Sequence, residues 1–256
     1  MRAPLPAATP PGPLPPPPEP AALAAPPRRA AHGLRDVVKA MAIIWGLDLL
    51  FFGSLAVATA LRPGGKIDDS VGLRFAPVDA VITLGVCWLF ACRKYRRPFR
   101  DGFGLSSARP RTVLAAGLAG ALAALFYGQL AVRGIGNTPT PMSEWVGKIV
   151  STPNGFLFLL VTFPAIAAVE ELYYRGFIFP ALAERWGLLV AAAVTAAWFG
   201  LLHLPQLQGN WVAFSYVVSM GIFFTLLRAR TGSTAPGLTA HVAYNTTLLL
   251  GGLLFG

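Results

Sequence analysis

The sequence predicts an all-α fold, a polytopic bundle of about seven to eight transmembrane helices. Of its 256 residues, 55% are hydrophobic and only 12% are charged, whereas soluble domains average about 25% charged residues. Several apolar runs also reach the length that crosses a hydrocarbon core. A transmembrane β-barrel would show short alternating segments instead, and the sequence has none. The chain is therefore expected to lie in a membrane.

The N-terminal segment 1–36 differs in composition from the rest of the chain. It is rich in Pro and Ala, with four consecutive prolines at 15–18. Such a sequence cannot build a core and favours a disordered or polyproline-like tail. It also lacks the basic and then apolar pattern of a signal peptide. We expect a cytoplasmic tail over 1–36 and a transmembrane domain over 37–256.

The first apolar runs are expected to form helices over 37–61, 76–92 and 112–132. The third run is rich in Ala and Gly, which allows a neighbouring helix to pack closely. Three prolines interrupt the following segment, so a loop is expected over 133–154. Asp48, in the first run, is expected to pair with a nearby basic residue or to line a cavity.

The later apolar runs predict four more helices, from near Gly155 to about Leu182 and over 188–204, 211–228 and 237–255. The first two of these should form a hairpin, with Glu184 and Arg185 in its turn. The second ends at His203-Leu204-Pro205, because a proline does not continue a helix.

Lys and Arg gather in the predicted loops, as the positive-inside rule expects. Placing the loops 93–111, 183–187 and 228–236 inside puts the N-terminus in the cytoplasm and, for seven spans, the C-terminus outside. The net charge of +10 follows from these loops, so nucleic-acid binding is not expected. The abundance of Ala, Gly and Arg indicates a high-GC bacterium and hence a bacterial inner membrane.

Two adjacent carboxylates, Glu170 and Glu171, end an apolar run that begins at Phe156. A charged residue inside a bilayer costs about 3 kcal/mol on insertion scales, and adjacent like charges disfavour ionisation. Arg175 follows Glu171 by four residues, so the two can pair along a helix. Glu170 has no such partner and is therefore predicted to be the reactive member of the pair.

Two further pairs occupy single helix faces at a spacing of four residues, Phe199 with His203 and His241 with Asn245. At 1.5 Å per residue, Glu170 and His203 should lie at matching heights in a hairpin that turns near residue 186. His241 follows Arg230 by only eleven residues. It is therefore expected at a shallower level, unless the preceding turn is sunken or unwound.

These side chains predict a hydrolase that acts on an amide bond within the membrane. Glu170 and His203 can each act as a general base on a water held between them. His241 and Asn245 can donate hydrogen bonds to the developing oxyanion.

Three motifs resemble those of the CPBP intramembrane protease family: Glu170-Glu171-x-x-Tyr174-Arg175, Phe199-x-x-x-His203 and His241-x-x-x-Asn245. This family, also called Abi-type, includes type II CAAX prenyl endopeptidases and bacterial bacteriocin-processing and self-immunity proteins. The resemblance covers about 165–250 and implies a helical catalytic core over about 137–256. By position, it implies that Glu170 and His203 activate the water, that His241 and Asn245 stabilise the oxyanion, and that Glu171 and Arg175 orient the site.

A metal ion is the alternative to a metal-free mechanism. Glu170, His203 and His241 could together ligate Zn²⁺ in a three-ligand open site, which would make the protein a metalloprotease. No His-Glu-x-x-His motif is present. Because the residues above suffice without a metal, a glutamate-type mechanism with no cofactor is favoured.

The partners implied are the lipid bilayer and a membrane-anchored protein or peptide. The class of this substrate stays open among a prenylated CAAX protein, a leader peptide and a C-terminal sorting signal. Two other functions are considered. A proton-coupled transporter would more typically show two related halves, and the sequence shows no internal repeat. A non-catalytic scaffold has no need for the complete set of motifs.

Overall fold

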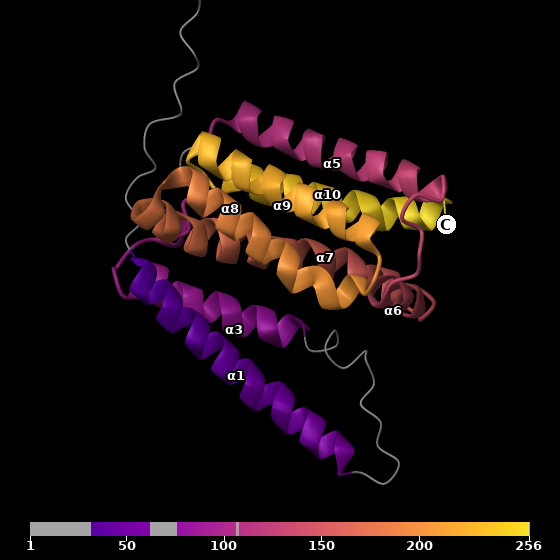
Figure 1. Ribbon diagram of the computed structural model, residues 1–256, viewed down its shortest axis with the longest axis horizontal. Coiled ribbons are helices and arrows are strands. Elements are labelled where there is room, and N and C mark those ends of the chain that lie inside the picture. The colour runs from indigo at the N-terminus through magenta and orange to yellow at the C-terminus, as the bar shows by residue number, and fades with distance from the viewer. Residues whose placement is uncertain (1–31, 62–75, 106–107, 256) are drawn as a thin grey trace, which may run out of the picture.

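The computed structural model describes residues 32–61, 76–105 and 108–255 (Figure 1). All regular structure in these ranges is helical, which confirms the predicted all-α class. In chain order the elements are α1 (Leu34–Ala60), α3 (Ala76–Trp88), η1 (Leu89–Arg93), α4 (Phe99–Gly102), α5 (Pro110–Val132), α6 (Pro141–Val150), α7 (Gly155–Glu171), η2 (Leu172–Ile178), α8 (Phe179–Leu207), α9 (Trp211–Thr231) and α10 (Ala235–Phe255). The elements η1 and η2 are π-helices. Most of the predicted tail, 1–31, lies outside the described residues.

Four of the described helical stretches are long and apolar enough to cross a membrane: Leu34–Ala60, Pro110–Val132, Gly155–Leu207 and Trp211–Thr231. The 53-residue stretch is broken at Gly187, which has a φ of 82°. It therefore contains two of the predicted helices, and the predicted hairpin turn falls at Gly187, with Glu184 and Arg185 still helical. The chain is a membrane protein, and the number of seven to eight spans stays a prediction.

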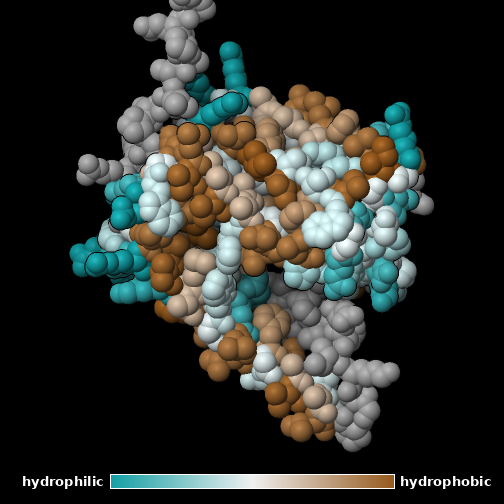
Figure 2. Space-filling view, in the orientation of Figure 1, coloured by the Kyte–Doolittle hydropathy of each residue, from teal (hydrophilic) through white to brown (hydrophobic). Residues whose placement is uncertain are grey.

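The surface of the bundle has the pattern of a protein surrounded by lipid. Figure 2 shows apolar residues over the middle of one face, with hydrophilic residues toward the helix ends at its left and right. Large apolar side chains are exposed on several helices, among them Leu49, Leu118, Val161 and Leu189. Exposed apolar patches of this extent mark membrane or protein contacts, so this surface is suited to contact with lipid.

The predicted loop over 133–154 is wrong, because it contains helix α6. Thr140 caps this helix: its hydroxyl accepts a hydrogen bond from the Ser143 N–H at 3.1 Å, and Ser143 Oγ accepts one from the Thr140 N–H at 2.9 Å. Pro141 occupies the first turn, where its missing N–H costs nothing. The prolines that indicated a loop therefore include one that starts a helix.

The boundary placed at residue 36 is too late, because residues 32–36 belong to the folded part. His32 is 1% exposed, its ring stacks on Phe177 with centroids 4.5 Å apart, and its Nε2 lies 2.7 Å from the Phe177 carbonyl oxygen. Asp36 is buried in the first turn of α1 and pairs with Lys94 Nζ at 2.6 Å. The end of the predicted tail therefore packs against η2.

Helix α10 lies between α5 and α7 and also contacts α9 (Figure 1). It approaches α5 closely at Gly120, where a Cβ atom would lie only 2.1 Å from the Ala240 carbonyl oxygen. The small residues of the third apolar run thus permit the close packing that the sequence predicts. Since α10 carries His241 and Asn245, this contact helps to place the candidate site.

Candidate active site

The Glu pair lies where an α-helix widens into a π-helix. Helix α7 ends at Glu171, and all seven residues of η2 are buried. The sequence predicted a helix that continues past Arg175, and it does, but nothing in the sequence indicated the π-helical turn. Such turns are rare and occur frequently at functional sites.

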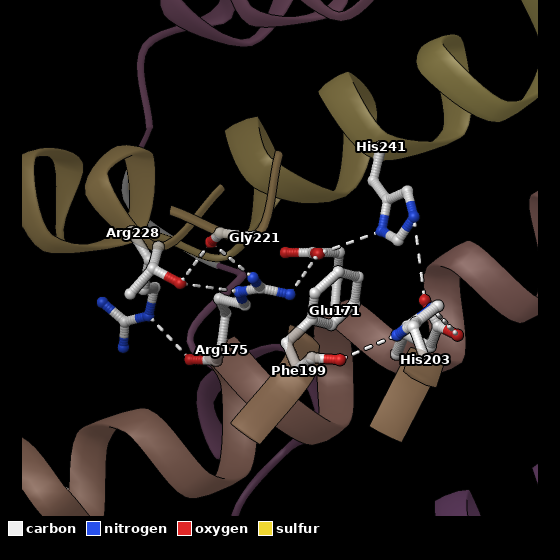
Figure 3. Close-up of polar contacts among 9 residues, drawn as sticks. Glu171, Arg175, Phe199, His203, Gly221, Arg228 and His241 are labelled. Atoms are coloured by element: carbon white, nitrogen blue, oxygen red, sulfur yellow. Dashed lines mark hydrogen bonds and ion pairs between the residues drawn. The ribbon is translucent and has the colours of Figure 1, made fainter. Parts of the chain in front are cut away.

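Arg175 holds Glu171 in a fixed position. Its Nη1 donates to Glu171 Oε1 at 2.8 Å, and both side chains are fully buried. The guanidinium also donates to the Gly221 carbonyl at 2.7 Å and to Thr225 Oγ1 at 3.2 Å (Figure 3). The predicted pair along the helix is therefore present, and α9 supplies two further acceptors.

Glu171 also contacts His241. Glu171 Oε1 lies 3.1 Å from His241 Nδ1 (Figure 3), and the imidazole stacks on Phe224 with centroids 4.5 Å apart. A carboxylate paired with a guanidinium acts as an acceptor, so Nδ1 is the donor and carries a proton. The other ring nitrogen, Nε2, is directed toward Glu170.

Glu170 lies between two histidines. Its Oε2 is 3.7 Å from His241 Nε2, and its Oε1 is 3.9 Å from His203 Nε2. Both separations exceed a direct hydrogen bond, and a water bonded to both groups would lie beside the line that joins them. The side chain of Glu170 is 24% exposed, whereas that of Glu171 is fully buried.

His203 is oriented by its own helix. Its Nδ1 lies 2.7 Å from the Phe199 carbonyl oxygen (Figure 3). Since a carbonyl only accepts hydrogen bonds, Nδ1 carries the proton and Nε2 is left facing Glu170. The spacing of four residues allows this contact within one helical turn. The predicted match in height between Glu170 and His203 is confirmed.

The expectation of a shallower level for His241 is wrong. Helix α10 begins inside the protein, because Ser233 and Thr234 in the preceding turn are fully buried. The Thr234 N–H donates to the Gly104 carbonyl at 2.8 Å, and its hydroxyl donates to the Phe103 carbonyl at 2.7 Å. This sunken turn brings His241 to the level of the Glu pair.

These groups meet at a cavity of about 530 Å³. Asn245, one turn beyond His241, lines it as well. Within the described residues the Asn245 side chain makes no hydrogen bond. The structure thus places four predicted residues around one cavity: Glu170, His203, His241 and Asn245. Glu171 and Arg175 lie directly behind them and are fully buried.

The model of the family described as type II CAAX prenyl endopeptidase Rce1-like matches residues 152–247. Because it resembles that family, we call residues 152–247 the Rce1-like segment. It contains every predicted site residue, from Glu170 to Asn245. The resemblance inferred from the three motifs is therefore confirmed.

A stretch of the chain also matches a curated protein. The chain is 29% identical over 96 residues to the uncharacterized protein YyaK of Bacillus subtilis (strain 168). The matched stretch is 36% of this chain and 32% of YyaK, so the chain spans about a third of that relative's length. No solved structure matches the chain.

A second pair of acids reaches the cavity from helices outside the Rce1-like segment. Asp48 of α1 lines the cavity, one of the two roles expected for it, and Asp79 of α3 lines it too. The two carboxyl groups lie close to each other, and Asp48 Oδ1 is buried without a hydrogen-bond partner among the described residues. The sequence analysis did not single out Asp79. The available signal was an acid inside the apolar run 76–92, one turn before Thr83.

The zinc alternative requires Glu170, His203 and His241 to converge on one ion. Tetrahedral ligands about 2.0–2.2 Å from zinc lie about 3.3–3.6 Å from one another, and Glu170 lies 3.7 Å from His241 Nε2 and 3.9 Å from His203 Nε2. Among the residues that the structure describes, no group of three or more His, Cys, Asp or Glu is arranged to hold a metal ion. No step below depends on a metal.

Proposed function

We propose that this protein is an intramembrane endopeptidase that cleaves a peptide bond of a membrane-anchored protein or peptide. The observation that carries the proposal is the position of Glu170, whose two carboxylate oxygens face the Nε2 atoms of two histidines at a cavity within an apolar bundle. The match of residues 152–247 to the Rce1-like family supports the same activity.

A water between Glu170 and His203 would be the nucleophile. The Glu170 carboxylate takes one proton from the water while the water oxygen bonds to the substrate carbonyl carbon. His203 Nε2 accepts a hydrogen bond from the second proton of the water. When the tetrahedral intermediate collapses, the C–N bond breaks and Glu170 passes its proton to the leaving amine. Each turnover consumes one water and restores the carboxylate.

His241 and Asn245 would stabilise the negative oxygen of the intermediate. The Asn245 amide is free to donate, because it has no other hydrogen bond among the described residues. Donation from His241 Nε2 requires the imidazolium form, since Nδ1–H is already directed at Glu171. Glu171, anchored by Arg175, fixes the ring in place.

The site suits a peptide that arrives from the lipid phase, because its polar groups lie within largely apolar helices. We propose a bacterial inner membrane as its location and a cytoplasmic N-terminus, as the basic loop 93–111 favours. Three substrate classes are proposed for testing: a prenylated CAAX protein, a leader peptide and a C-terminal sorting signal.

The experiment is a cleavage assay with purified protein in detergent micelles and quenched fluorescent peptides of these three classes. Glu170→Gln keeps the size of the side chain but removes the base, so the rate should fall about 10²- to 10⁴-fold. His203→Ala should fall in the same direction. The matched control is Glu184→Gln, which removes an exposed carboxylate near the hairpin turn and should leave the rate unchanged.

The alternatives predict other outcomes. Cleavage by Glu170→Gln at the wild-type rate would contradict the proposal. If no peptide is cleaved, and proton-coupled uptake into liposomes depends on Glu170, the transporter reading is favoured. Metal analysis of the active protein tests the metalloprotease alternative, which requires stoichiometric zinc and loss of activity with a chelator.

A further inference from the structure

Arg228, near the end of α9, is a buried cation without an anionic partner. Its side chain is 4% exposed, and among the described residues no carboxylate pairs with it and its Nη1 has no hydrogen-bond partner. A buried charge without a partner is costly. The mechanism proposed above does not use Arg228, so its burial calls for an explanation.

The π-helix η2 leaves one backbone carbonyl without a main-chain donor. At its end the Phe179 N–H donates to the Tyr174 carbonyl, five residues back. In the same pattern, the N–H of residue 180 would donate to the Arg175 carbonyl. That residue is Pro180, which has no N–H. A buried carbonyl is seldom left unpaired, so Arg175 requires a donor from elsewhere.

Arg228 supplies that donor. Its Nε lies 3.0 Å from the Arg175 carbonyl oxygen (Figure 3). The guanidinium lies over the Phe179 ring, 5.7 Å from its centroid. Its Nη2 packs against Gly104, where a Cβ atom would be only 3.1 Å away. The charge is thus held in one orientation, with Nε directed at η2.

One face of α9 therefore contacts both the side chain and the backbone carbonyl of Arg175. Gly221, Thr225 and Arg228 are four and three residues apart, so they share this face. The first two accept hydrogen bonds from the Arg175 side chain, and the third donates to its backbone. The Arg175 side chain in turn holds Glu171, which orients the histidine of α10.

We propose that Arg228 is a positioning residue: by capping the Arg175 carbonyl, it fixes the π-helical turn that directs Glu170 at the cavity and Glu171 at His241. It acts through the backbone of η2 and does not touch the substrate. The proposal rests on the proposed function for its kinetic consequence, but the backbone contact itself can be tested without any activity.

The kinetic test compares Arg228→Met with Arg230→Met. Both remove a cation from the last turn of α9, but Arg230 is exposed. Loss of the charge-assisted hydrogen bond from Arg228 should lower kcat about tenfold or more and leave KM within about twofold, because substrate contacts are unchanged. Arg230→Met should match the wild type. Equal kcat values for the two variants would overturn the proposal.

A second substitution tests whether Arg228 acts through this carbonyl. Pro180→Ala provides the N–H that is missing opposite the Arg175 carbonyl. In the Pro180→Ala background, Arg228→Met should therefore cost much less than it does in the wild type, about threefold or less in kcat. A full tenfold loss in that background would show that Arg228 acts by another route. This comparison also decides the matter if the single variant does not fold.

Hydrogen exchange followed by mass spectrometry reads the same contact in the absence of turnover. Arg228→Met should raise the exchange rate of amides in η2 at least about tenfold relative to Arg230→Met, and Pro180→Ala should reverse the increase. Unchanged exchange in η2 would overturn the capping role. A failure of the proposed function would appear in the Glu170→Gln cleavage assay and not in the exchange rates. The two proposals can therefore be tested separately.

Discussion

Glu170 and Glu171 are adjacent in the sequence but lie in different surroundings. Glu171 is fully buried and shared between a guanidinium and an imidazole, whereas Glu170 has no partner closer than 3.7 Å within the described part of the chain. The i,i+4 spacing to Arg175 predicted this difference. The contact from Glu171 to His241 could not be predicted, because it depends on how deep α10 begins. Depth of that kind is set by a buried turn and leaves no periodic signal.

Glu171 is expected to be far more important for stability than Glu170. Glu171→Gln leaves the buried Arg175 without its anion, and removing one partner of a buried pair costs about 3–5 kcal/mol. Glu170→Gln, at a partly exposed position, should change the free energy of unfolding by less than about 1 kcal/mol. Denaturant unfolding in detergent, followed by tryptophan fluorescence, measures both. Equal losses would contradict the roles assigned to the pair.

His32 should make stability depend on pH. Burial lowers the pKa of His32 below its ordinary value of 6.5, against smaller opposing effects of the Phe177 carbonyl and Asp36. The folded state therefore binds a proton less readily than the unfolded state. Stability is complete above about pH 6.5 and is lost as the pH falls below that value. Protonation would also place an N–H on Nδ1, which has no partner among the described residues.

The measurement for His32 compares unfolding midpoints of the wild type and His32→Gln at pH 7.5 and 5.5. The wild type should lose more stability on acidification than the variant, whose amide can still donate to the Phe177 carbonyl and does not titrate. Parallel changes in the two proteins would assign the acid sensitivity to other groups.

At the scale of elements, length and apolar content predicted the long helices well. Bounds agree closely for α5, expected over 112–132 and found over Pro110–Val132. The prediction of a loop in place of α6 is wrong because proline also occurs in the first turn of a helix, where Pro141 lies. The π-helix η2 was missed for a deeper reason. It is stabilised by hydrogen bonds between η2 and α9 that involve Arg175 and Arg228. The local sequence of η2 does not show such contacts.

The contact between α5 and α10 predicts a difference between two glycines of one helix. Gly120→Ala would place a methyl group 2.1 Å from the Ala240 carbonyl oxygen, so the helices must separate. We expect a loss of about 1–3 kcal/mol. At Gly128 no atom lies within 4 Å of an added Cβ, and Ala there should stabilise by up to about 1 kcal/mol through helix propensity. Unfolding midpoints of the two variants in detergent check the difference.

At the scale of the whole molecule, the cavity is built from helices at both ends of the chain. The sequence identified the residues supplied by the C-terminal half, because its motifs have recognisable spacings. It did not identify Asp79, because a single acid in an apolar run has no spacing to read. That Asp48 and Asp79 meet at the cavity follows from the packing of α1 and α3 beside η2, which is a tertiary property.

The π-helix η2 also has a consequence for how this sequence can vary in length. A π-helical turn is equivalent to an α-helix with one extra residue. Removing one residue from η2 would restore regular α-helix, but it would rotate Glu170 by about 100° relative to α8. Each helix would remain sound while the carboxylate and His203 no longer faced each other. Insertions and deletions should therefore be rejected in this segment even where substitutions are accepted.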